Sequence, residues 1–264
     1  MKKRFDGGQI VLSRPIPDKF QLHMHEFFEI YVFLDGDADY IVEGMNYSLR
    51  QNDVIIINRH EMHRAYHKTQ KRYERIMFHI MPSFFEENHC EEYMRVFQDR
   101  DFGTKNKIPA EYAEKSGLLD AIKRWIQYTD NGRKTNGAIA SSVLIEILHI
   151  LNNIKVLHEG NNENSIVSQI IYYINKNFRN KITLDELAEQ FYLSKYHLCR
   201  IFKEATGYTV IGYINNRRIA ETKELYKLGM NISSACVEAG FSSYTSFYKA
   251  YRKQFGVLPK FGLK

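Results

Sequence analysis

Two histidines and a glutamate in the first part of the chain have the residue types and the spacing of a ligand-binding site. His23, His25 and Glu29 are all odd-numbered, and alternate residues of a β-strand point to the same face. A strand here would therefore present two imidazoles and a carboxylate together. Such groups suit a divalent metal such as Mn, Fe, Ni or Zn, and they also hydrogen-bond the hydroxyls of a small polar ligand.

The surrounding segment, residues 20–82, is predicted to form the β-structure that positions these side chains. Residues 27–34 and 53–58 are β-branched and aromatic runs, bounded by turns rich in Gly, Asn and Asp. Several short strands at this spacing are typical of a sandwich or a small barrel. From about residue 84 the pattern becomes helical. The apolar stripe of residues 138–157 needs a cover, which is either the β-structure or a second copy of the chain.

A second set of functional residues lies in a repeat near the end of the chain. Residues 184–207 and 232–256 each contain a short amphipathic helix, a turn, and a helix that ends in a basic-aromatic run and Gly. Helix-turn-helix units of this kind place their second helix in the major groove of DNA. Two such units indicate a chain that reads two neighbouring groove segments.

The positive charge of the chain is concentrated in the same region. Residues 166–264 hold 15 Lys and Arg against 7 Asp and Glu, whereas residues 1–165 hold 22 against 24. A basic block on an otherwise nearly neutral chain is typical of a phosphate-binding surface. Double-stranded DNA is therefore the expected partner of the C-terminal region.

The length of 264 residues suits two domains. Residues 159–165 are polar and lack apolar anchors, so we expect a linker there, between an N-terminal domain at 1–158 and a C-terminal domain at 166–264. The predicted fold class is α+β: a β-barrel or sandwich followed by helices, then an all-α domain with two helix-turn-helix units. The sequence has no run of about 18 apolar residues and no signal core after its basic start, so we expect a cytoplasmic protein without a membrane partner.

Local signals mark the helix boundaries of the C-terminal domain. Thr183 and Glu186 have the spacing of a capping box. Ser194 is expected to cap the second helix of the first unit, and Ser242 or Ser243 that of the second. Gly240 falls in the second turn, where a left-handed backbone is easiest for Gly. Its counterpart in the first turn is Tyr192, which would cost about 1 kcal/mol in that conformation.

The C-terminal domain resembles the AraC/XylS family of bacterial transcription regulators over nearly all of residues 166–262. The residues that carry the resemblance are Leu187, Ala188, Leu193, Ser194, Leu198, Arg200, Phe202, Lys203, Gly207, Tyr213, Ile214, Arg218, Ile219, Ile232, Ala239, Gly240, Phe241, Phe247, Tyr251, Arg252, Lys253, Gly256 and Pro259. The resemblance implies that the start of each recognition helix enters the major groove. It also implies a homodimer and makes RNA polymerase a candidate partner.

Carried over by position, the residues expected to face DNA bases are Tyr196, Cys199 and Arg200 in the first unit and Tyr244, Thr245, Tyr248 and Lys249 in the second. Arg200 has the geometry to address guanine O6 and N7, whereas its counterpart Lys249 cannot form the same bidentate contact. Contacts with phosphate are expected from Lys195, Lys203, Arg217, Arg218, Arg252 and Lys253.

The N-terminal domain resembles the cupin-type sensor domains that members of this family often carry. His23, His25, Glu29 and Gly36 fit the spacing His-x-His-x3-Glu-x6-Gly, and His63 stands at the position of the third cupin histidine. The resemblance implies two alternatives for His23, His25, Glu29 and His63. They either form a metal site or line a pocket for a small polar effector. The 18 Tyr and 17 Phe of the chain would suit a sugar as that effector, and Tyr31 either lines the pocket as well or fills the barrel. We expect no resident cofactor.

These patterns predict a transcription regulator that binds DNA and responds to a small molecule, not an enzyme. Two alternatives remain open at this point. One is a constitutive regulator whose cupin domain is only a dimerisation scaffold. The other is a metal-cupin enzyme for which DNA binding is secondary.

Overall fold

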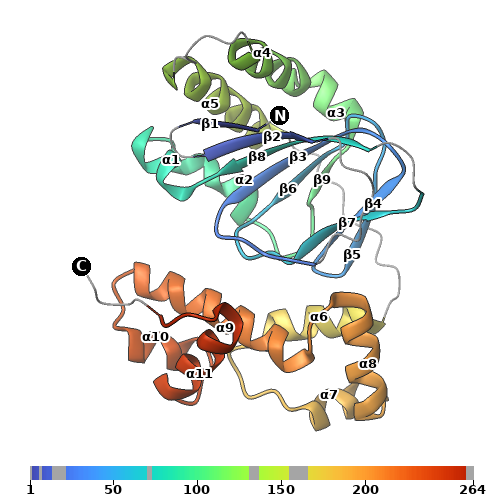
Figure 1. Ribbon diagram of the computed structural model, residues 1–264, viewed down its shortest axis with the longest axis vertical. Coiled ribbons are helices and arrows are strands. Elements are labelled where there is room, and N and C mark those ends of the chain that lie inside the picture. Colours follow the sequence, from blue (N-terminus) through green and yellow to red (C-terminus); the bar gives the residue numbers. More distant parts are fainter. Residues whose placement is uncertain are drawn as a thin grey trace. The chain divides into compact units, whose positions relative to one another are not determined.

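A computed structural model describes residues 2–5, 8–13, 22–69, 73–130, 137–154 and 166–259. The chain divides into two units, Met1–Glu163 and Asn164–Lys264. The residues of the predicted linker, 159–165, lie outside the described part. The first unit contains two β-sheets and several helices, and the second is helical (Figure 1). The predicted fold class is thereby confirmed.

The strands of the first unit pair antiparallel in two sheets. The larger sheet has the order β1 (Lys2–Phe5), β2 (Gly8–Ser13), β8 (Glu74–Ile80), β3 (Phe28–Asp35), β6 (Val54–Ile57) and β9 (Lys107–Ile108). The smaller sheet has the order β5 (Met45–Ser48), β4 (Ala38–Val42) and β7 (His63–His67). Residues that are distant in sequence therefore become neighbours across β3 and β8.

Three strands lie outside the segment that was predicted to be β-structure. β1 and β2 precede residue 20, and β9 interrupts the region expected to be helical. β2 is paired with β8, so that Ile10 lies opposite Phe78, and the two residues of β9 pair with β6. These short segments carry little local signal. Their conformation comes from pairing with strands that are distant in sequence.

Both faces of β3 are buried, which explains its nearly continuous apolar run. Phe28, Ile30 and Val32 belong to a core shared with the helices of the unit. Tyr31 and Phe33 belong to a second core, which includes residues of the smaller sheet. The alternation along the strand thus assigns odd-numbered residues to the interior between the sheets and even-numbered residues to the helical side.

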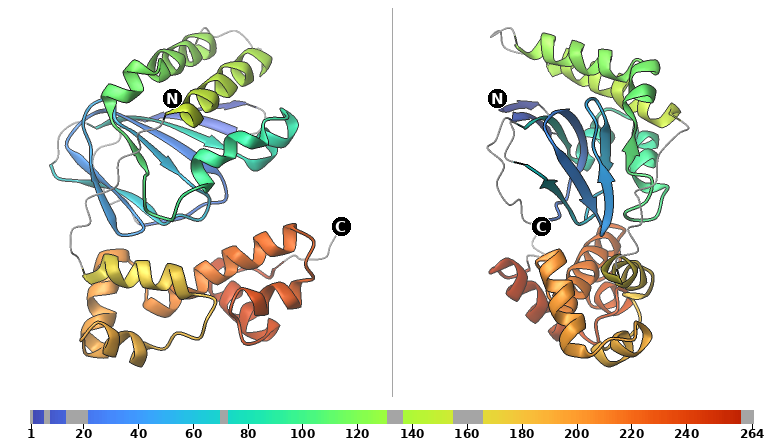
Figure 2. Two further views of the ribbon diagram at one scale, coloured as in Figure 1. Left: turned by 180° about the vertical axis from the view of Figure 1, so that it is seen from behind. Right: turned by 90° about the vertical axis from the view of Figure 1, so that its right-hand side faces the viewer.

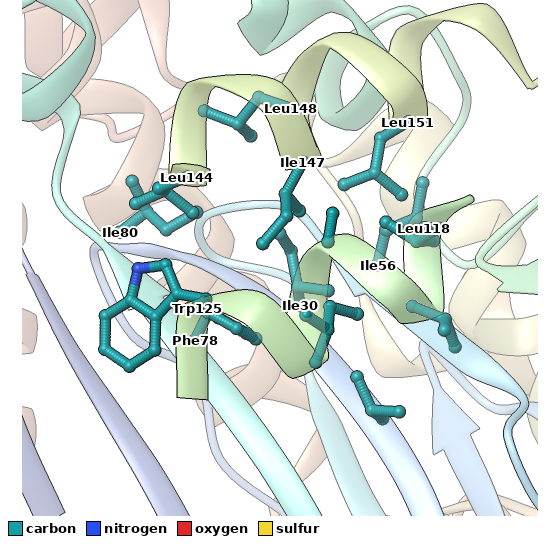
Figure 3. Close-up of a cluster of buried hydrophobic side chains, with 14 of the residues drawn as sticks. Ile30, Ile56, Phe78, Ile80, Leu118, Trp125, Leu144, Ile147, Leu148 and Leu151 are labelled. Carbon is teal, nitrogen blue, oxygen red and sulfur yellow. The ribbon is translucent and has the colours of Figure 1, made fainter. Parts of the chain in front are cut away.

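The helices of the first unit cover the outer face of the larger sheet (Figure 2). Leu144, Ile147, Leu148 and Leu151 of one helix are fully buried in that core (Figure 3). The described part of the apolar stripe predicted at 138–157, residues 138–154, is therefore covered by the chain's own sheet, the first of the two alternatives. The elements are α1 (Pro82–Glu87), η1 (Glu91–Met94), α2 (Arg95–Gln98), α3 (Ala110–Lys115), α4 (Leu118–Asp130) and α5 (Gly137–Asn153).

The second unit consists of α6 (Ile166–Asn177), α7 (Leu184–Gln190), α8 (Lys195–Thr206), α9 (Val210–Lys227), α10 (Ile232–Glu238) and α11 (Tyr244–Phe255). The pairs α7–α8 and α10–α11 are the two helix-turn-helix units, and α9 joins them. Within the described ranges, no helix combines the length and the apolar character needed to cross a membrane. Cys90, Cys199 and Cys236 are unpaired.

Candidate functional site

Three of the predicted ligand residues meet just before β3 and at the start of β7. The backbones of His23 and His63 pair with each other, with N–H to carbonyl distances of 3.1 and 2.9 Å. The rings of His23 and His25 lie 4.4 and 4.7 Å from the ring of His63, measured between centroids. Each residue offers one ligand atom, and these atoms lie within 4.8 Å of one another. One small ligand or ion can therefore contact all three.

Backbone carbonyls orient two of these rings. His25 Nδ1 donates to the carbonyl of Phe27 at 2.9 Å, and His63 Nδ1 donates to the carbonyl of Glu61 at 2.7 Å. A carbonyl only accepts, so both Nδ1 atoms carry the proton and each Nε2 is left with a lone pair in the neutral ring. Burial lowers the pKa of His63 to about 3. The His63 ring is therefore neutral at physiological pH.

Glu29 lies beside this histidine cluster. Its Oε2 is 3.3 Å from His25 Nε2 and 3.0 Å from His79 Nε2, and Tyr40 donates to its Oε1 at 3.2 Å. Burial alone would raise the pKa of the carboxyl, but the contacts with His25 and His79 and the proximity of His63 hold it well below the usual range. With Nδ1 protonated, His25 Nε2 needs a proton or a cation to face this carboxylate favourably.

His79 is a member of the site that the sequence patterns did not single out. It lies directly opposite Glu29 in the register of β3 and β8. Ile76, Phe78 and Ile80 of β8 are buried in the helical core, so the alternation places His79 on the other face. That alternation is visible in the sequence. The pairing with Glu29, which brings the two side chains together, is set by the sheet.

Tyr31 was a candidate for an effector pocket or for filling the barrel, and the structure shows the second. Its side chain is fully buried between the two sheets, and its hydroxyl contacts the hydroxyl of Tyr73. Tyr47 is also buried and donates to the carbonyl of Gly103 at 2.6 Å. These tyrosines fill the interior and satisfy their hydroxyls internally. The site is reached instead at the strand ends, where His23 is exposed.

The second helix of each helix-turn-helix unit begins as predicted. Thr183 and Glu186 form a capping box at α7, Ser194 caps α8, and Ser243, not Ser242, caps α11. The turns of both units use a left-handed residue, with φ of 54° at Tyr192 and 97° at Gly240. The two turns therefore share one geometry despite their different residues.

The predicted base-facing side chains lie on the open faces of α8 and α11. Leu198 and Phe202 bury one face of α8, and Phe247 buries one face of α11. The opposite faces carry exposed or half-buried side chains, which are Tyr196, Cys199, Arg200, Tyr244, Thr245, Tyr248 and Lys249. Of the predicted phosphate contacts, Lys195, Lys203, Arg252 and Lys253 are also exposed. All of these are accessible to a nucleic acid.

Arg217 does not fit this arrangement, and Arg218 is only partly accessible. Arg217 is only 4% exposed and lies over the ring of Phe178, so its assignment as a phosphate contact is wrong for this structure. Arg218 is half-buried and donates to the carbonyls of Phe178 and Asn180, at 2.7 Å in both cases. Both arginines hold α9 to the end of α6 and the segment that follows. Adjacent positions on a helix point to different faces, and only the packing decides which face is buried.

Comparisons with known proteins connect these sites to a family. Residues 9–148 match the model of the AraC-like ligand binding domain, and residues 187–261 match a model of the helix-turn-helix domain. The chain is 22% identical to the transcriptional activator RhaS of Klebsiella pneumoniae, over 91% of this chain and 86% of that protein. It is 33% identical to the transcriptional activator AarP of Providencia stuartii, over 37% of this chain and 73% of that protein.

Among solved structures, ToxT from Vibrio cholerae O395 matches with a TM-score of 0.39 and 13% identity, over 96% of each chain. The ligand-binding model alone spans more than half of the present chain, and the helix-turn-helix model covers the repeated units. The chain therefore belongs to the AraC family of transcription regulators, with a ligand-binding domain followed by a helix-turn-helix DNA-binding domain.

Proposed function

We propose that this regulator responds to a small polar effector that binds at the histidine cluster, defined as His23, His25, His63 and the adjacent Glu29. One observation carries the proposal. The Nε2 atom of His63 is buried and has no hydrogen-bond partner in the described part of the chain, and the Nε2 atom of His25 beside it faces the carboxylate of Glu29 at 3.3 Å. Leaving a buried polar atom unsatisfied costs about 1–3 kcal/mol. A ligand that hydrogen-bonds to His63 Nε2 would recover that energy on binding.

The chemistry of the cluster favours a molecule with several hydroxyl groups, such as a sugar. A hydroxyl donates to a neutral imidazole nitrogen, and the ionised Glu29 accepts from another hydroxyl of the same molecule. The tyrosines occupy the interior between the sheets. The effector would accordingly bind at the strand ends, beside the exposed His23.

A divalent cation is the second candidate ligand, favoured by the tautomers of His25 and His63. Metal-binding histidines commonly donate their other ring N–H to a carbonyl or a carboxylate, as these two do. Three imidazoles with a neighbouring carboxylate fit Mn, Fe, Ni or Zn. A cation would also separate His25 Nε2 from Glu29 Oε2. In a regulator such an ion would act as the signal or hold an anionic effector, and we propose no catalysis.

Thermal unfolding of the full chain tests both candidates. The protein is treated with a chelator and then titrated separately with sugars, other small metabolites and Mn, Fe, Ni or Zn. A ligand at 100-fold its dissociation constant should stabilise the folded state by about 2.7 kcal/mol. The shift should disappear in His63→Ala and persist in His149→Ala, whose histidine is exposed on α5.

The three outcomes of this titration differ. A shift with a sugar or metabolite that depends on His63 supports the effector proposal. A shift with metal alone, also dependent on His63, replaces the effector by the cation. If no compound shifts the unfolding of the wild type, the proposal is contradicted in favour of a constitutive regulator with a scaffold domain.

For the DNA-binding domain, we propose that α8 and α11 enter successive segments of the major groove. The exposed positions of the two helices would read bases, with Arg200 on a guanine. Lys195, Lys203, Arg252 and Lys253 would contact phosphates and set the register. The exposure of these side chains supports the assignment.

We also propose a homodimer that activates transcription through contact with RNA polymerase. The relatives RhaS and AarP are transcriptional activators, which supports the second part. Because the apolar face of α5 packs on its own sheet, a dimer interface would not use that face. Sedimentation equilibrium tests the dimer, and transcription with purified polymerase tests activation. A monomer at micromolar concentration would contradict the first part.

A further inference from the structure

A basic groove lies between the segment that precedes α7, the helix α9 and the second helix-turn-helix unit. It has a volume of about 540 Å³ and is defined here by the polar residues Arg179, Lys181, Asn215, Arg218, Ser242 and Ser246. Arg179 and Lys181 come from the segment between α6 and α7, ahead of the first unit (Figure 1). Asn215 and Arg218 come from α9, and the two serines come from the second helix-turn-helix unit. The groove therefore connects the second helix-turn-helix unit with the segment that leads into the first.

The charge of the basic groove is positive. Three of its lining residues are cations, and none is acidic. Lys181 is exposed and forms no hydrogen bond or ion pair with any residue of the described ranges. Arg179 pairs with Glu221, but the side chain of Arg179 is 58% exposed. An exposed pair of this kind contributes about 1 kcal/mol or less, so an anion can displace it.

Arg218 provides a cation at a fixed position in the groove. Its Nε and Nη2 atoms are held by the carbonyls of Phe178 and Asn180, and its guanidinium lies 5.9 Å from the centre of the Phe241 ring. Burial lowers the pKa of Arg218, but a guanidinium remains protonated at neutral pH. No described residue accepts a hydrogen bond from Nη1. The Nη1 N–H groups of Arg218 can thus donate to a ligand. Little side-chain entropy would be lost on binding, because the guanidinium is already held in place.

The two walls of the groove are held against each other at Gly240. A Cβ at this position would lie 2.6 Å from the carbonyl oxygen of Arg179 and 2.8 Å from its Cα. The turn of the second helix-turn-helix unit therefore packs directly on the backbone of Arg179. The cations of one wall and the hydroxyls of Ser242 and Ser246 on the other keep a fixed separation.

We propose that the basic groove binds a phosphate of the DNA backbone in the stretch that connects the two major-groove segments. This deepens the DNA-binding function and rests on the proposal that α8 and α11 read successive segments. A DNA backbone that runs past the second helix-turn-helix unit toward the start of the first would meet both walls of the groove. Phosphate contacts set register without reading sequence. The groove would thus fix the spacing of the two recognition helices on the duplex.

The test uses the full chain with Lys181→Ala, and Lys227→Ala as a control of equal charge. Lys227 is exposed at the end of α9 and lies outside the groove. Affinity for a mixed-sequence duplex of about 30 base pairs, enough for two successive groove segments, is measured against salt concentration. Losing one phosphate contact should weaken binding several-fold and reduce the slope of log K against log salt by about 0.9. Lys227→Ala should retain the wild-type slope.

Other results would overturn the proposal. Equal slopes and affinities for Lys181→Ala and wild type would remove the groove from the interface, while binding by the wild type would leave the DNA-binding function intact. A wild type that does not bind the duplex would instead contradict that function. A second experiment measures the thermal unfolding of the same proteins at increasing concentrations of inorganic phosphate. Stabilisation that requires Lys181, with an unchanged DNA slope, would assign the groove to a small phosphorylated ligand.

Discussion

The turns of the two helix-turn-helix units share one backbone geometry, which needs a left-handed residue, but they use different residues for it. Both turns contain a left-handed residue, Tyr192 in the first unit and Gly240 in the second. Tyr192 is 96% exposed, whereas a Cβ at Gly240 would strike the backbone of Arg179. The turn itself therefore tolerates a side chain at some conformational cost. Glycine is required only where another segment packs against the turn.

The recognition helices differ as well. Arg200 of α8 can form two parallel hydrogen bonds to a guanine, whereas Lys249 of α11 is a point charge. Tyr196 of α8 is 80% exposed, and Thr245 at the matching position of α11 is also exposed. The difference at Arg200 and Lys249 therefore favours the first helix-turn-helix unit for specific base reading, while the second lines the basic groove.

The largest effect is expected from Gly240→Ala. The new Cβ would overlap Arg179 and would also occupy a left-handed backbone, so the free energy of unfolding should fall by about 2–4 kcal/mol. Urea denaturation measures the loss. Gly256→Ala is the matched control, because φ there is 70° and nothing lies within 4 Å of the added Cβ. It should lose only about 1 kcal/mol, and equal losses for both variants would contradict the packing argument.

The next largest effect concerns DNA recognition. Arg200→Ala should lose about 1–3 kcal/mol of discrimination against a changed guanine. Lys249→Ala should lose less, and Lys203→Ala should weaken specific and random DNA alike. Competition binding with a selected operator and its single-base variants separates these cases. An equal loss on operator and random DNA for Arg200→Ala would end its assignment to a base.

Substitutions at the first helix cap of each helix-turn-helix unit should have smaller effects on the free energy of unfolding. Thr183→Ala removes the hydroxyl of a capping box and should cost about 1–2 kcal/mol, while Asn231→Ala at α10 should cost about 1 kcal/mol. Denaturant unfolding of both variants provides the measurement. Glu186→Ala should be destabilising because it removes the second half of the box. A neutral Glu186→Ala would show that the reciprocal bond adds nothing.

The smallest effect is expected from Tyr192→Gly. Relief of the left-handed conformation should contribute about 1 kcal/mol, and the greater freedom of glycine in the unfolded chain should offset most of it. The unfolding free energy should therefore change by less than about 1 kcal/mol. The same denaturant titration applies. A larger loss would mean that the Tyr192 side chain packs in solution, unlike its exposed state here.

At the histidine site, some residues could be predicted from local sequence patterns and others could not. The spacing of His23 and His25 predicted a shared face, and the resemblance to cupin sensor domains added His63; the structure brings their ligand atoms within 4.8 Å of one another. His79 was missed because it joins Glu29 only through the register of β3 and β8. For Tyr31 the sequence left two possibilities open, because an inward-facing aromatic can either line a pocket or fill it. The volume available between two sheets decides between these outcomes.

The sequence by itself determined the features that depend on neighbouring residues. These are the two repeated units, the capping box at Thr183, the cap at Ser194 and the left-handed turns, whereas the choice between Ser242 and Ser243 as the cap of α11 came from the structure. Tertiary structure decided the features that depend on distant segments. It buried Arg217, covered the stripe of α5 with the larger sheet, paired β2 with β8, and assembled the basic groove from three segments. Hydrogen bonds within a turn are set by a few adjacent residues, whereas burial depends on which surfaces meet.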